Sequence, residues 1–171
     1  MKYTKSEINH LMKKVEIKTQ ITVFDSFEEL SSSVKVLMNS AIEAKNNAYA
    51  PYSKFKVGAA FLMEDGTIVT GNNQENAAYP SGMCAERVAI WKVSSDFPNL
   101  KIRKLAITAS SSSQITKEPV APCGACRQTL SEYELKQKDK IEVYFMGEIG
   151  AVIKTDSLLD LLPVAFDKSF L

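Results

Sequence analysis

Hydrophobic and polar positions alternate near the start of the chain and then change to a helical spacing. In residues 15–24 (VEIKTQITVF), a Val, Ile or Thr occupies every second position, which is the period of a strand with one apolar face. Apolar side chains then recur every three or four positions, which predicts an amphipathic helix over residues 27–48. Ser26 and Glu29 have the spacing of a capping box at its start, and Pro51 agrees with its end.

The remainder of the chain alternates between strand-like and helix-like segments. A hairpin is predicted over residues 55–71 with Asp65 and Gly66 at its turn, and a polar loop follows it. The later segments are a helix, a strand, a second helix, two strands and a short final helix, over residues 83–94, 104–110, 124–138, 141–146, 151–155 and 156–162. Strands that alternate with helices predict an α/β layered domain.

Composition and charge exclude several classes of protein. The chain has 171 residues, 45% of them hydrophobic and 24% charged, which is typical of one folded globular domain and not of a disordered chain. Its 21 basic and 20 acidic residues give no basic surplus of the kind that grips nucleic acid. It has no apolar run of membrane-spanning length and no signal-peptide pattern. We therefore expect a cytoplasmic protein that binds neither nucleic acid nor a membrane.

Three cysteines, Cys84, Cys123 and Cys126, fall in two short stretches, YPSGMCAERVAI and APCGACRQTL. An odd number in a chain of this length argues against a disulfide framework and favours metal binding or catalysis. Three protein ligands leave the fourth position of a tetrahedral zinc ion open for water, which is typical of a catalytic site. A closed structural site would need a fourth ligand, and His10, the only histidine, is the alternative that the sequence offers.

Charged residues accompany both cysteine stretches. Glu86 follows Cys84 by two positions, so it can point into the same cavity and move a proton between water and a substrate nitrogen. The alternative is a glutamate that only suits the dipole of a helix N-terminus. Arg87 and Arg127 directly follow the two motifs, and we expect them to donate hydrogen bonds to the sulfurs and tune the metal. The alternative for each arginine is a solvated helix residue.

The order of CAE and PCGAC is the signature of zinc-dependent deaminases. The chain resembles the short, three-cysteine form of the cytidine deaminase family, because APYSKFKVGAA, NNQENAAYP, CAER and PCGACRQ are similar to family motifs in the same order. The resemblance covers about residues 27–166. It implies a three-layer α/β/α sandwich around a mixed five-stranded sheet, over residues 26–171. Residues 1–25 exceed the family pattern, and we expect an N-terminal extension with a strand and a short helix at a sheet edge or subunit contact.

The resemblance also implies an activity. The family carries out zinc-dependent hydrolytic deamination of cytidine and deoxycytidine to uridine and deoxyuridine, with release of ammonia, in pyrimidine salvage. Hydroxide on a Zn²⁺ ion would attack C4 of the pyrimidine while Glu86 shuttles protons. The short form of the family is a homotetramer, so we expect sites that are shared across subunit interfaces.

Two polar residues of the NNQENAAYP segment match family positions that bind the sugar. Asn73 and Glu75 would hold a ribose hydroxyl, and one amide with one carboxylate can both donate to and accept from such a group. A site of this kind discriminates strongly against a substrate that lacks the hydroxyl. The alternative is that both residues only cap turns.

Further positions are carried over from the family to the pyrimidine base and to a neighbouring subunit. Phe55 matches a phenylalanine that packs against the base, although packing in the core at the start of a strand is its alternative. The backbone around Ala85 would contact the base. Tyr79 and Phe166 match positions that reach into the site of a neighbouring subunit.

Three other functions fit parts of the pattern. A related aminohydrolase, such as an antibiotic-nucleoside deaminase, shares the signature but tends to lack the Phe55 and ENAAYP pattern. An enzyme that edits polynucleotides would want a basic channel and base-stacking aromatic residues. A metal-stabilised interaction domain would unfold without zinc, and exchanging Glu86 for glutamine would change nothing measurable in it.

Overall fold

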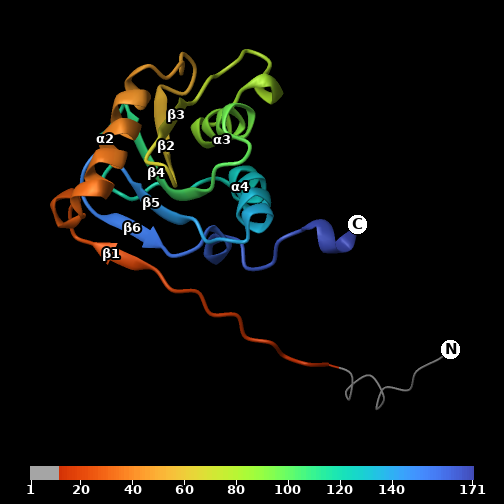
Figure 1. The fold of residues 1–171 in the computed structure, drawn as a ribbon. Coiled ribbons are helices and arrows are strands. Elements are labelled where there is room, and N and C mark those ends of the chain that lie inside the picture. Colours follow the sequence, from red (N-terminus) through yellow and green to blue (C-terminus); the bar gives the residue numbers. More distant parts are fainter. Residues whose placement is uncertain (1–11) are drawn as a thin grey trace.

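A mixed six-stranded sheet forms the centre of the computed structural model, which describes residues 12–171 (Figure 1). The strands are β1 (Thr22–Phe24), β2 (Phe55–Met63), β3 (Ile68–Asn72), β4 (Ile102–Ser111), β5 (Glu142–Met146) and β6 (Val152–Thr155). They lie in the order β1-β6-β5-β4-β2-β3. The neighbours β4 and β5 are parallel, and all other neighbours are antiparallel. The predicted mixed sheet is confirmed, with six strands instead of five.

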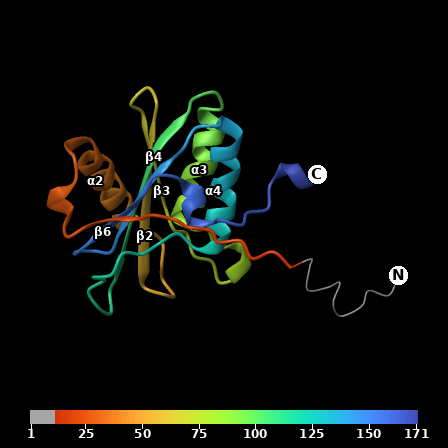
Figure 2. The same cartoon turned by 90° about the horizontal axis from the view of Figure 1, so that it is seen from below.

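Helices cover both faces of the sheet. The α-helices are α2 (Ser32–Asn46), α3 (Ala85–Asp96) and α4 (Gly124–Gln137). Figure 2 shows α2 on one face of the sheet and α3 with α4 on the other, so the predicted three-layer sandwich is confirmed. The described residues also form four short 3₁₀ turns, η1 (Phe27–Glu29), η2 (Tyr79–Ser81), η3 (Leu158–Leu161) and, near the C-terminus, η4 (Lys168–Phe170). Among residues 12–171, no helix has the length and apolar character that crossing a membrane requires.

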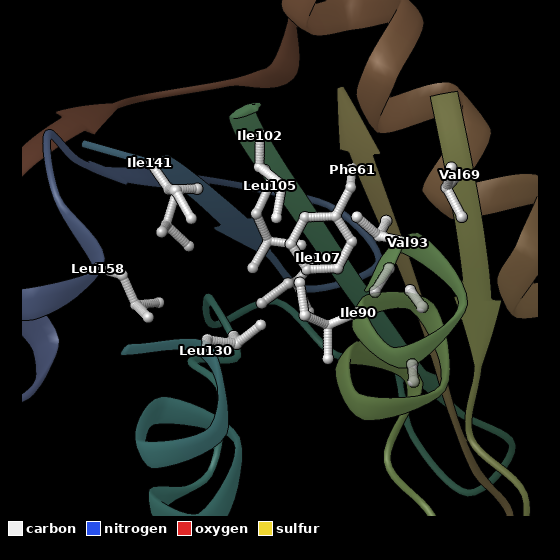
Figure 3. Packing of buried hydrophobic residues seen from close by; sticks show 14 of the residues in the cluster. Phe61, Val69, Ile90, Val93, Ile102, Leu105, Ile107, Leu130, Ile141 and Leu158 are labelled. Carbon is white, nitrogen blue, oxygen red and sulfur yellow. The ribbon is translucent and has the colours of Figure 1, made fainter. Parts of the chain in front are cut away.

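The hydrophobic core is divided by the sheet into two clusters. Successive side chains of a strand point to opposite faces, so Phe61 and Ala60 of β2 belong to different clusters. Phe61 packs with Ile90 of α3 and Leu130 of α4 (Figure 3). Ala60 packs against α2 instead. Because α3 and α4 share one apolar cluster, their N-termini are held on the same face of the sheet.

Two glycines allow helices to approach the sheet closely. A Cβ atom added to Gly58 of β2 would lie 2.0 Å from the carbonyl oxygen of Ala41 in α2. One added to Gly71 of β3 would lie 2.6 Å from the backbone nitrogen of Ala89 in α3. Any larger side chain at these positions would push the helix away. Gly71 therefore sets the depth at which α3 lies on the sheet.

The N-terminal segment supplies the additional strand. Only Thr22–Phe24 of the predicted strand at residues 15–24 pairs, and it pairs with β6 at the edge of the sheet. No helix occurs among residues 12–25. His10, the alternative fourth metal ligand, lies outside the described residues, as do the other residues of the range 1–11.

Helix starts differ from the prediction for a local reason. Ser26 caps the short turn η1 through Glu28 N–H, while Glu29 accepts a hydrogen bond from Asp25 N–H. Leu30 then has an extended backbone, so α2 starts only at Ser32 and not at residue 27. The first cysteine stretch behaves in the same way, because its extended cysteine delays α3 to residue 85.

Candidate active site

Three cysteine sulfurs meet at the N-termini of α3 and α4. Cys84 and Cys123 are the N-cap residues of these helices, and Cys126 lies in the first turn of α4. The Sγ atom of Cys123 is 3.9 Å from that of Cys84 and 3.5 Å from that of Cys126, and all three atoms lie within 4.8 Å of one another. Two sulfurs on a tetrahedral zinc ion lie about 3.8 Å apart, given zinc–sulfur bonds of about 2.3 Å. The spacing therefore fits one zinc ion.

Within residues 12–171, no other histidine, cysteine or acidic side chain joins this group. The described part of the chain thus offers three ligands to a metal that takes four, which is the arrangement of a catalytic zinc site. The structure thus brings together the three cysteines that the sequence proposed as metal ligands.

Arg87 compensates for negative charge at the sulfurs. Its Nη2 atom donates a hydrogen bond to Cys84 Sγ at 3.3 Å. Hydrogen bonds from Cys126 and from Arg87 lower the pKa of Cys84 to about 5. The hydrogen bond to Cys84, together with burial, raises the pKa of Cys126. Without a metal, the two thiols therefore favour one thiolate, at Cys84, next to the guanidinium.

Arg127 occupies a different position from the one expected. Its Nε atom donates to the carbonyl oxygen of Pro122 at 2.7 Å, and its Nη1 atom donates to that of Leu161 at 3.1 Å. The structure records no bond from Arg127 to a sulfur among the described residues. The side chain instead ties the turn before Cys123 to η3, so it supports the position of α4.

Glu86 is a buried carboxyl group at the wall of the adjoining cavity. Its side chain lies in the first turn of α3 and the residue is only 4% exposed. Burial raises the pKa of Glu86. A carboxyl group with a raised pKa holds a proton more readily than a free glutamate does, which suits a group that must both accept and release a proton in general acid–base catalysis. Ala85, its neighbour, is fully buried and faces the core cluster.

A cavity of about 750 Å³ opens beside the sulfurs, which is within the usual size range of small-molecule sites. Most of the residues proposed from the sequence line it, namely Phe55, Asn73, Glu75, Tyr79, Cys84, Glu86, Arg87 and Cys123. Ala85, Cys126, Arg127 and Phe166 are not part of its lining. Segments far apart in the sequence therefore form one pocket, with two of the three cysteines, Cys84 and Cys123, at its wall.

Asn73 is held by the start of β2. Its Oδ1 atom accepts a hydrogen bond from Val57 N–H at 2.8 Å, and its Nδ2 atom donates to the carbonyl oxygen of Phe55 at 2.9 Å. The side-chain amide of Asn73 thus fixes the backbone of Phe55, the aromatic residue that lines the pocket. Each of its two polar atoms can still form one more hydrogen bond with a ligand.

Glu75 is held by the loop that precedes β2. Its Oε2 atom accepts from Tyr52 N–H at 2.9 Å and from Ser53 N–H at 3.2 Å, and its Oε1 atom accepts from the Ser53 hydroxyl. The Ser53 hydroxyl, followed by the two backbone N–H groups, lowers the pKa of Glu75. Glu75 therefore presents a carboxylate to the cavity.

The two aromatic residues assigned to a neighbouring subunit are exposed. Tyr79 is 79% exposed at the cavity, with its ring centroid 6.5 Å from that of Tyr52. Phe166 is 60% exposed, and its ring stacks on Phe170 with 5.6 Å between centroids. The Nε2 atom of Gln128 in α4 donates a hydrogen bond to the carbonyl oxygen of Phe166 at 2.8 Å. A role for either residue in another subunit stays a prediction.

Sequence reasoning overlooked several lining residues, among them Tyr52, Ser53, Val57 and Ile107. Val57 and Ile107 belong to core strands, where a hydrophobic residue gives no sign that it faces a cavity. Ser53 stands two positions before Phe55 in the APYSKF motif. A hydroxyl so close to a proposed base-stacking residue was the available signal.

Comparisons with known proteins agree with this geometry. The model of the family described as "Cytidine and deoxycytidylate deaminase zinc-binding region" matches residues 31–139. The chain is 42% identical over 132 residues to a cytidine deaminase of Halalkalibacterium halodurans, which covers 77% of this chain and 92% of that protein. It is 43% identical over 135 residues to one of Sporosarcina psychrophila, with coverage of 79% and 92%.

Solved structures show the same likeness. The crystal structure of cytidine deaminase from Burkholderia pseudomallei superposes with a TM-score of 0.66 at 39% identity, and the match covers 77% of this chain and 97% of that one. That of cytidine deaminase from Mycobacterium tuberculosis gives a TM-score of 0.61 at 31% identity, with coverage of 80% and 99%.

Proposed function

Since the chain belongs to the cytidine and deoxycytidylate deaminase family, we propose that it deaminates cytidine and deoxycytidine hydrolytically to uridine and deoxyuridine, with release of ammonia. The observation that carries the proposal is the position of a buried carboxyl group, Glu86, at the wall of a nucleoside-sized cavity beside three sulfurs spaced for zinc. This constellation suits hydrolysis of a carbon–nitrogen bond by an activated water.

Cys84, Cys123 and Cys126 would hold the metal, and zinc bound there supplies a water acidified for attack on C4 of the pyrimidine. Glu86 would carry two protons in turn. The first passes from the attacking water to N3 of the ring, and the second passes from the hydroxyl group then attached to C4 to the departing amine. Its raised pKa suits both transfers. Arg87 limits the negative charge of the three thiolates through its hydrogen bond to Cys84.

The rest of the cavity suits a nucleoside. Phe55 and Val57 give one wall an apolar surface against which a flat base can pack. Asn73 and Glu75 offer an amide and a carboxylate to the sugar. The backbone around Ala85, at the start of α3, would contact the base.

The proposal extends to the assembly and location of the protein. We propose a homotetramer in which Tyr79 and Phe166 contact a neighbouring subunit's site, because both side chains are largely exposed in one subunit. Residues 1–25 would act as an extension to a deaminase domain of residues 26–171. Cytoplasmic pyrimidine salvage is the proposed setting, where a reducing environment keeps three thiols available for a metal.

Ultraviolet-monitored turnover of cytidine and deoxycytidine tests the proposal. The wild type should deaminate both, and Glu86→Gln should lose a factor of about 10²–10⁴ in turnover while it keeps its zinc. Glu132→Gln, an exposed glutamate of α4, is the control and should behave as wild type. Zinc-loaded wild type that turns over neither nucleoside would contradict the substrate, and an active Glu86→Gln enzyme would contradict the proton carrier.

A further inference from the structure

The hydroxyl group of Ser53 is fixed between two partners. Its Oγ atom accepts a hydrogen bond from Phe55 N–H at 3.0 Å and donates to Glu75 Oε1. A hydroxyl has one proton, and since Phe55 N–H occupies a lone pair of the oxygen, that proton is directed at the carboxylate. Ser53 therefore links the backbone of the residue proposed to pack on the base to the carboxylate proposed to bind the sugar.

The remaining hydrogen-bonding capacity of Glu75 is small. A carboxylate accepts about four hydrogen bonds, two on each oxygen. Oε2 already accepts from Tyr52 N–H and Ser53 N–H, and Oε1 accepts from the Ser53 hydroxyl. One acceptor position is left, on Oε1, at a residue that lines the cavity.

We propose that Ser53 is a positioning residue that aims the single free acceptor of Glu75 at the 3′-hydroxyl of the nucleoside, and thereby sets the selection for that hydroxyl. The inference rests on the proposed function. Cytidine and deoxycytidine both carry the 3′-hydroxyl on the sugar ring and differ at the 2′ position. A side chain that binds a ring hydroxyl of both substrates must therefore bind the 3′-hydroxyl.

The surrounding contacts give the carboxylate little freedom. The backbone N–H of Glu75 donates to the carbonyl oxygen of Tyr49 at 2.8 Å, and Tyr49 N–H donates to that of Asn73 at 3.0 Å. The loop with Glu75 and the loop with Ser53 are thus joined through both backbone and side chains. Loss of the Ser53 hydroxyl would free Oε1, so that the carboxylate could turn toward water instead of the sugar.

The experiment compares two substrates that differ only in the 3′-hydroxyl, deoxycytidine and 2′,3′-dideoxycytidine. Wild type should strongly prefer deoxycytidine. In Ser53→Ala, the ratio of the two kcat/KM values should fall about tenfold or more, since a hydrogen bond to a charged group is lost. The ratio should fall because kcat/KM decreases for deoxycytidine, while kcat/KM for 2′,3′-dideoxycytidine stays nearly unchanged.

Two further variants separate positioning from general damage. Ser53→Thr keeps a hydroxyl and should restore most of the preference. Ser111→Ala removes a hydroxyl from the strand position that pairs with Phe55, and should leave the ratio unchanged. Among the described residues, the Ser111 hydroxyl bonds to Ser113 alone. Zinc content and thermal unfolding are measured for each variant to confirm that it is folded.

The outcomes are distinct for the inference and for the proposed function. An equal loss for both substrates in Ser53→Ala, or an unchanged ratio, would overturn the positioning role while deamination by wild type stands. Calorimetry supplies a second readout, the Kd values of deoxyuridine and 2′,3′-dideoxyuridine. The difference between these two Kd values should be smaller in Ser53→Ala than in wild type. Wild type that neither deaminates nor binds these nucleosides would overturn both the inference and the function.

Discussion

The Nη2 atom of Arg87 lies 3.3 Å from the Sγ atom of Cys84, one helical turn earlier in the chain. Cys84 caps α3, and Arg87 belongs to the first turn of the same helix. The cationic side chain and the helix N-terminus thus act on the same sulfur, and both favour its thiolate form.

Exchange of Arg87 for glutamine should weaken zinc binding, because the charge opposite the thiolates is lost. Loss of a partner of this kind costs about 10–100-fold in metal affinity or activity, which competition with a chromophoric chelator can measure. Lys92→Gln is the control, since Lys92 lies on the same helix in an exposed ion pair with Asp96. Equal zinc affinities for Arg87→Gln and wild type would contradict the role given to Arg87.

Replacement of Gly71 by alanine should destabilise the fold by about 1–3 kcal/mol, the usual cost of overpacking. The new methyl group would lie 2.6 Å from Ala89 N and 2.7 Å from the Ala85 carbonyl oxygen, so α3 must move. Urea unfolding measures the change. Gly124→Ala is the matched control, because its added Cβ meets no atom within 4 Å, and its stability should equal or slightly exceed that of wild type. Equal losses in the two variants would disprove the steric argument.

Glu134→Gln should lower the free energy of unfolding by about 2 kcal/mol, because a buried acceptor of several N–H groups is exchanged for an amide. Glu134 accepts from Ile141 N–H at 2.7 Å, from Leu158 N–H at 2.9 Å and from the Ser157 hydroxyl. Denaturant unfolding gives the comparison with Glu132→Gln, whose side chain is exposed on the same helix. If both variants unfold as wild type does, the buried carboxylate contributes no stability.

Deletion of residues 1–25 should destabilise the domain and promote association. It removes β1, and with it Phe24, which packs on the cluster beneath α2. The loss of one partly buried phenylalanine costs about 2 kcal/mol, and the uncovered edge of β6 can pair with other chains. Thermal unfolding and light scattering report the two effects. Deletion of residues 1–14 leaves β1 intact and should change neither, so similar behaviour of both deletions would argue against the edge-strand role.

Acid should weaken nucleoside binding at a lower pH in wild type than in Ser53→Ala. The Ser53 hydroxyl is the first cause of the lowered pKa of Glu75, so its removal should raise that pKa. The ionised carboxylate and its contacts are complete above the ordinary glutamate pKa and are lost as the pH falls through the depressed value. A carbon NMR titration of the Glu75 carboxyl group measures both variants, with Ser111→Ala as control. Coincident titration curves for wild type and Ser53→Ala would contradict the effect of the Ser53 hydroxyl on the pKa of Glu75.

The sequence predicted the layers and the grouping of the three cysteines because both depend on local patterns. The spacing of apolar residues located α2, and cysteines beside helix starts located the sulfurs. The capping pattern at Ser26 was assigned to the wrong element, since a cap signal cannot show whether a 3₁₀ turn or a long helix follows it. The sequence predicted the added strand and its place at a sheet edge, but not the partner of that strand, because β6 lies more than a hundred residues later.

The hydrogen-bond partners of the polar site residues were harder to predict from the sequence than the residues themselves. The sequence could not show that Asn73 bonds to the backbone of β2, or that Arg127 bonds to carbonyl oxygens. Such partners depend on how loops lie against each other in three dimensions. Ser53 was overlooked for the same reason, since its importance comes from a carboxylate 22 positions away.

The three sulfurs become neighbours at very different stages of folding. Cys123 and Cys126 are three positions apart, so they meet once the first turn of α4 forms, on the sub-microsecond timescale of helix formation. Cys84 is 39 positions from Cys123, and β4, which pairs with β2 in the middle of the sheet, lies between them in the chain. Such non-local pairing forms slowly. A chain in which β4 has not yet paired with β2 therefore offers a metal only two neighbouring thiols, and the third joins them after this pairing.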